Sequence, residues 1–123
     1  MRLTNYAIEA KIAQLNPFLD RADLIGYAAA RNVRNLRNAG AAYISTRDAL
    51  ISKYGTIERD ENDKPTGRYI IPFNDPNFST FKSEIDRIGN IEQDVDIFTI
   101  SYSEVMDKLT GNEILAIDWM LTD

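Results

Sequence analysis

The stretch DLIGYAAARNVRNLRNAGAAYISTRDALISKY, residues 23 to 54, decides the fold of this chain, because it contains no proline and has a helical repeat. The repeating positions are Ala29, Val33, Leu36, Gly40, Tyr43, Arg47, Leu50 and Tyr54. Steps of four and three residues alternate along them, which predicts one long helix with a seam of about 3.5 residues per turn. Such a seam suits a helical hairpin or bundle, and Gly55 is well suited to end the helix.

Shorter elements are predicted on both sides of this helix. In chain order they are a helix capped by Thr4 or Asn5 that ends before Pro17, a β-hairpin with strands at Thr56–Glu58 and Tyr69–Ile71, a helix capped by Asp75, a strand at Val95–Tyr102, and helices at Glu104–Leu109 and Asn112–Leu121. The last two follow capping boxes at Ser101-x-x-Glu104 and Thr110-x-x-Glu113. The predicted fold is α+β and mainly helical: one domain, residues 1–123, in which the long helix packs in a bundle beside a small antiparallel sheet.

The composition excludes several classes of protein. The chain has 123 residues without histidine or cysteine, so it lacks the usual general base, the thiolate nucleophile and the commonest ligands of transition metals. No catalytic motif replaces them, and we expect neither an enzyme nor a cofactor. The net charge of -5 argues against direct binding of nucleic acid. No apolar run approaches the roughly 20 residues of a transmembrane helix, so no membrane association is expected.

Five carboxylates form an acidic stretch at Glu84, Asp86, Glu92, Asp94 and Asp96. Paired carboxylates serve in acid–base catalysis or bind magnesium. However, Glu84 and Asp86 do not face one another on a helix, and a strand places Asp94 and Asp96 together on its solvent face. The stretch is therefore either a solvated surface or a patch that imitates the phosphates of nucleic acid.

Charged residues of the long helix and the last helix are candidates for a protein interface. Arg31, Arg34 and Arg37 share helical spacing. They either hold phosphate or an acidic protein, or form a solvated face of the helix. Arg47 lies in the seam, and Asp118 lies on the apolar face of the last helix, where a buried charge needs a partner. We expect them to pair with each other or to mark the edge of an interface; alternatively, Arg47 extends outward from the helix end.

Leu115 and Trp119 are a second candidate for the interface. Both lie beside the apolar face of the last predicted helix rather than within it. If both are exposed, they form an anchor for a partner, because tryptophan is enriched at the centre of protein interfaces. If both are covered, they close the core instead.

The chain resembles the small, uncharacterised phage and prophage proteins of the DUF1617 type. The matching residues are Leu3-Thr4-Asn5-Tyr6, Ala30-Arg31-Asn32 with Leu36, Leu50-Ile51-x-Lys53-Tyr54-Gly55, Asp60-Glu61-Asn62, Ile97-x-x-Ile100 and Leu109-Thr110-x-x-Glu113-Ile114-x-x-Ile117-Asp118-x-Met120. The resemblance implies a phage origin, a role in virion assembly or in the infected cell, and a location in the virion or the host cytoplasm. It assigns no functional residues.

Together these observations predict a non-enzymatic, phage-type protein that acts by binding other proteins. The simplest role is a structural or assembly component of the virion, and the small residues along the helix seam also permit self-association. The alternative is a phage-encoded inhibitor of a host system, an anti-defence protein whose acidic surface imitates nucleic acid. The partner is then a phage structural protein or a host protein.

Overall fold

The computed structural model describes residues 1–123, and contacts divide the chain into two compact units. Unit 1 comprises Met1–Gly40 and Glu92–Asp123, and unit 2 comprises Ala41–Ile91. The predicted long helix is confirmed as α2 (Leu24–Tyr54), whose first part belongs to unit 1 and whose remainder belongs to unit 2. The α+β, mainly helical fold class is also confirmed. The single domain stays a prediction.

Asp23 and Gly26 determine where α2 begins. The Asp23 carboxylate accepts a hydrogen bond from the Gly26 N–H at 3.0 Å and pairs with the Arg21 guanidinium at 2.9 Å. A Cβ atom at position 26 would lie 1.9 Å from the carbonyl oxygen of Arg21. Only glycine fits there, so this residue shapes the entry to the helix although glycine lowers helix propensity.

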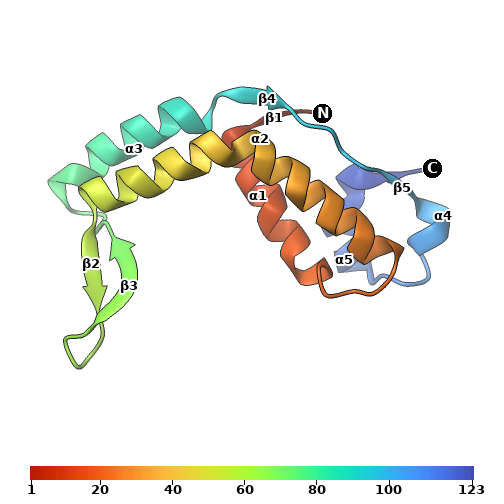
Figure 1. Cartoon of the computed structure of the whole chain (residues 1–123), viewed down its shortest axis with the longest axis horizontal. Helices are drawn as coiled ribbons and strands as arrows, with labels where there is room; N and C mark the ends of the chain where they lie inside the picture. The colour runs from red at the N-terminus through yellow and green to blue at the C-terminus, as the bar shows by residue number, and fades with distance from the viewer. The chain divides into compact units, whose positions relative to one another are not determined.

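Unit 1 contains most of the short elements. They are β1 (Arg2–Thr4), α1 (Asn5–Leu15), a 3-10 turn (Asn16–Phe18), the first part of α2, β4 (Glu92–Asp94), β5 (Ile100–Ser101), α4 (Tyr102–Val105), α5 (Gly111–Ile117), a second 3-10 turn (Asp118–Met120) and β6 (Leu121–Thr122) (Figure 1). Thr4 caps α1, since its hydroxyl accepts a hydrogen bond from the Ala7 N–H. Fifteen buried hydrophobic residues form one core, with Ile8, Leu15, Leu36 and Ile117 fully enclosed.

The predicted strand Val95–Tyr102 is wrong over most of its length. β4 pairs antiparallel with β1, β5 pairs parallel with β6, and the residues between them are not in a strand. The reason is the buried side chain of Asn32, whose amide donates to the carbonyl of Phe98 at 2.9 Å and accepts from its N–H at 2.7 Å. Because this side chain satisfies both backbone groups of Phe98 as a neighbouring strand would, that residue needs no strand partner.

The capping boxes near the carboxyl end have different outcomes. Thr110 and Glu113 form the predicted reciprocal box and begin α5. The predicted box at Ser101 is wrong, because its side chain makes no capping hydrogen bond to α4. The Ser101 hydroxyl instead bonds to the hydroxyl of Ser103 at 2.9 Å. The helix predicted at Glu104–Leu109 is therefore the shorter α4.

Unit 2 consists of the second part of α2, the strands β2 (Thr56–Arg59) and β3 (Pro65–Ile70), and α3 (Pro76–Gly89). The predicted hairpin is confirmed as an antiparallel pair, and it projects from the ends of the two helices (Figure 1). Asp75 caps α3 as predicted, accepting from the Asn77 N–H at 2.8 Å. The strands of the chain thus form three separate two-stranded pairs rather than one small sheet.

Candidate protein interface

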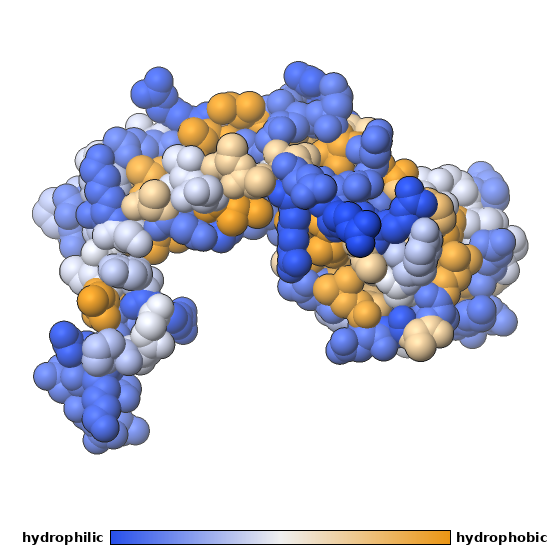
Figure 2. Space-filling view, in the orientation of Figure 1, coloured by the Kyte–Doolittle hydropathy of each residue, from blue (hydrophilic) through white to orange (hydrophobic).

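Unit 2 buries very little apolar surface. Its buried hydrophobic side chains are Tyr43 and Ile85. By contrast, every residue of β3 is exposed, and Phe73 after it is 86% exposed. Figure 2 shows hydrophobic residues at the surface of this unit, both on its helices and on its hairpin. An isolated hairpin gains little stability in water, and the apolar side chains of this hairpin stay in contact with solvent.

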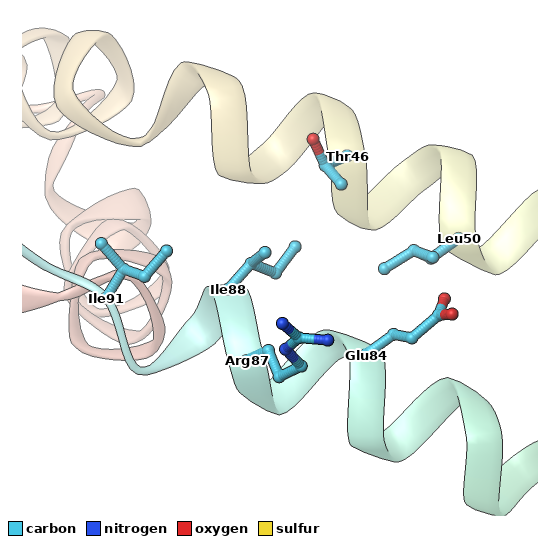
Figure 3. A pocket seen from close by; sticks show the side chains of 6 residues that line it. All are labelled: Thr46, Leu50, Glu84, Arg87, Ile88 and Ile91. Carbon is cyan, nitrogen blue, oxygen red and sulfur yellow. The ribbon is translucent and has the colours of Figure 1, made fainter.

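A groove of about 410 Å³ lies between α2 and α3 in unit 2. Its lining residues are Thr46, Leu50, Glu84, Arg87, Ile88 and Ile91. Leu50 extends from α2, and Glu84 and Ile88 extend from α3 into the space between the helices (Figure 3). We call the three apolar side chains among the lining residues, Leu50, Ile88 and Ile91, the apolar floor of the groove; Glu84 and Arg87 add one acidic and one basic group.

The two charged residues of this groove differ in their partners. Glu84 is half-buried, and its carboxylate accepts a hydrogen bond from the Tyr54 hydroxyl at 3.1 Å. Arg87 is exposed and forms no ion pair. An unpaired guanidinium beside an apolar floor can form a charge-assisted hydrogen bond with a carboxylate from outside this unit.

Arg31 lies on the exposed face of α2 in unit 1 and stacks on aromatic rings. Its guanidinium carbon lies 4.5 Å from the centre of the Phe98 ring and 5.9 Å from that of Tyr27. The two rings meet edge to face at 5.7 Å. Arg31 is therefore held by cation–π contacts at the surface, rather than being a free solvated side chain.

Arg34 borders a second hollow, of about 360 Å³, in unit 1. Leu19, Val33 and Arg37 also line it. Both arginines are exposed and form no ion pair. This hollow offers positive charge above an apolar floor, but it belongs to a unit whose core is already complete.

Arg47 and Asp118 each find a partner within their own unit. Arg47 pairs with Asp48 at 3.0 Å in unit 2. Asp118 is exposed and accepts a hydrogen bond from the Tyr102 hydroxyl in unit 1, which raises the pKa of that tyrosine. The prediction that Asp118 is buried on an apolar face is wrong, because α5 ends at Ile117 and Asp118 begins the 3-10 turn that follows. Neither charge needs the other.

Leu115 and Trp119 differ in exposure and do not form a joint anchor. The indole N–H of Trp119 donates to Gln14 at 3.2 Å and to the Ala116 carbonyl at 3.1 Å, and the ring packs against the core of unit 1. The ammonium of Lys11 lies 4.6 Å from the ring centre, and its partial burial lowers its pKa. Leu115 alone is exposed, at 75%.

The five carboxylates of the predicted acidic stretch are divided between the units. In unit 2, Glu84 binds Tyr54 and Asp86 pairs with Lys82 at 2.8 Å. In unit 1, Glu92 and Asp94 both pair with Arg2, at 2.9 and 3.3 Å, and Asp96 is exposed. Three of the five thus pair with a cation, which reduces the negative potential that an imitation of nucleic acid needs.

The sequence prediction missed most of the groove. Leu50 belonged to the seam and Ile88 to an apolar stripe of α3, but nothing in the sequence showed that the two helices leave a gap between them. The structure has no cluster of three or more acidic side chains able to hold a metal ion. None of its helices combines the length and apolarity needed to cross a membrane. The chain matches no protein-family model, no curated protein and no solved structure.

Proposed function

We propose that this chain is a non-enzymatic, phage-type protein that binds another protein through the groove of unit 2, as a structural or assembly component of a virion. The observation that carries the proposal is the small core of that unit. Two buried hydrophobic side chains, Tyr43 and Ile85, support a helix pair and a hairpin. Folded units of this size depend on burying more apolar surface than that, and a partner in the groove supplies it.

Site-specific photocrosslinking tests this proposal. A photoreactive amino acid replaces Ile91, which is 53% exposed at the groove, in a chain expressed in cells that are producing the phage. We expect crosslinks to a virion protein or to this chain itself. The matched control places the same amino acid at Asp20, which is exposed in unit 1. Equal crosslinking from both positions, or none from position 91, contradicts the proposal.

The alternative function, an inhibitor whose acidic surface imitates nucleic acid, has less support. The carboxylates it needs belong to different units, and Arg2 and Lys82 pair with three of them. Binding to a basic host nuclease that weakens steeply with salt favours this alternative over the assembly role, because ion pairs at a surface are screened. Substitution of Asp96 then weakens that binding more than substitution of groove residues.

A further inference from the structure

We propose that the α2–α3 face of unit 2, which carries the groove, packs against the same face of a second copy of this chain. The two helix pairs then form a four-helix bundle. This inference rests on the proposed function, because it names the occupant of the same surface. A symmetric dimer uses one surface twice, so that surface must be complementary to itself. The charges, the net charge and the helix lengths of unit 2 all meet this condition.

The charges at the groove are self-complementary. Glu84 and Arg87 lie about one helical turn apart on α3, and both line the groove (Figure 3). A two-fold axis crossing α3 at the level of Ile85 and Asp86 brings Glu84 of each copy opposite Arg87 of the other. Two ion pairs then form, and Arg87, which has none within the chain, gains a carboxylate. An occupant with charge of one sign satisfies only one of the two residues.

The net charge of unit 2 permits two copies to approach. Residues 41–91 carry seven basic and eight acidic side chains, whereas unit 1 carries seven basic and eleven acidic ones. Like net charges repel and slow association. Contact between two nearly neutral units costs little, and contact between two copies of unit 1 is opposed by their negative charge.

The helices of unit 2 have matching lengths. α3 has 14 residues and extends about 21 Å, and the part of α2 in this unit, residues 41–54, has the same length. Four-helix bundles pair such helices along their full length around an apolar interior. Leu50, Ile88 and Ile91, which line the groove, supply that interior from each copy.

Analytical ultracentrifugation of the purified full chain over a range of concentrations tests the inference, and charge reversal tests its geometry. We expect a monomer–dimer equilibrium in the wild type and about tenfold weaker dimerisation in Glu84→Lys and in Arg87→Glu, since each replaces two ion pairs by two repulsions. The double variant restores the dimer, because the pairs re-form with opposite polarity. Tyr54→Phe removes only the hydroxyl contact to Glu84. Its comparison with Glu84→Lys therefore separates the effect of losing that contact from the effect of losing the intermolecular ion pair.

Arg34→Glu is the matched control. Like Arg87, Arg34 is an exposed arginine without an ion pair, but it lies on α2 in unit 1. It leaves the dimer unchanged. A chain that stays monomeric up to about 1 mM, or a double variant no better than the single ones, overturns the second copy as occupant. If crosslinks from position 91 to a virion protein persist in that case, the proposed function survives; if they are absent too, both fail.

Discussion

Unit 1 and unit 2 share one helix but differ in how much they bury. Fifteen of the seventeen buried hydrophobic residues form the core of unit 1, and the other two lie in unit 2. Leu36 and Leu50 show the difference on α2 itself, since Leu36 is fully buried and Leu50 is half-exposed. The same helical repeat therefore serves a finished core in one unit and an open groove in the other.

The comparison shows that the two units differ in how much apolar surface each one buries by itself. A unit with a complete core gains its free energy of folding from contacts within the chain. A unit with a small core has apolar side chains left over, and these are the residues available to a partner. Substitutions, hydrogen exchange and acidification test this difference between the units.

Leu36→Ala and Leu50→Ala form a matched pair on one helix. We expect Leu36→Ala to lower the free energy of unfolding by about 3 kcal/mol, because it leaves a cavity in the core of unit 1. Leu50→Ala in dilute protein lowers it by less than about 1 kcal/mol, since its side chain is already half-exposed. Urea denaturation followed by circular dichroism measures both. Equal losses of the free energy of unfolding mean that unit 2 has a core of comparable strength, which contradicts the difference between the units.

Asn32→Ala tests the buried polar contact that replaces a strand in unit 1. The substitution leaves the N–H and the carbonyl of Phe98 without their partner, so we expect a loss of about 2 kcal/mol. Asn38→Ala on the same helix is the control, because Asn38 is exposed and its loss has little effect. Thermal denaturation measures the two variants, and a mild effect of Asn32→Ala means that water replaces the amide.

Hydrogen exchange compares the local stability of the two units without any substitution. We expect the backbone amides of the β2–β3 pair to exchange at least about tenfold faster than those of α1 and of the first part of α2, because exposed strands open locally. Mass spectrometry of peptic fragments measures the rates. Strong protection of the hairpin in dilute protein is incompatible with a weakly held unit 2.

Acidification acts on two helix caps of unit 1. The Arg21 guanidinium lowers the pKa of Asp23, and the backbone N–H of Thr110 lowers the pKa of Glu113. Both carboxylates therefore stabilise the folded chain fully at a pH above their ordinary pKa values of about 4. This contribution is lost as the pH falls through their lowered pKa values in the folded chain. Denaturation midpoints between pH 7 and pH 2 measure it. Asp23→Asn makes the decline shallower, and an unchanged profile contradicts the role of this cap.

The sequence predicted most of the elements that local chemistry decides, although the capping box at Ser101 was wrong. Thr4, Asp75 and Thr110 cap helices at the predicted positions, because a side-chain oxygen reaches a nearby backbone N–H. The seam of α2 followed from its spacing alone. The strand at Val95–Tyr102 was wrong because its β-branched residues serve the core of unit 1, while Asn32, more than sixty residues earlier, satisfies the backbone.

The candidate site was only partly predictable. Arg31 was identified as an interface residue, but its stacking on Phe98 depends on a segment distant in sequence. The pairing of Glu92 and Asp94 with Arg2 likewise joins residues that lie about 90 positions apart in the sequence. Such contacts give a charged side chain a partner within the chain, whereas a count of charges from the composition cannot show which of them have one.

By itself the sequence determined the long helix and the caps of three other helices at Thr4, Asp75 and Thr110, since these depend on residue type and on neighbours within one or two helical turns. Only the tertiary structure decided which part of α2 is covered. The repeat that contains Leu36 and Leu50 is the same in both halves, but the segments that return to pack on it are not. Burial depends on those returning segments, and that is why the groove became visible only in three dimensions.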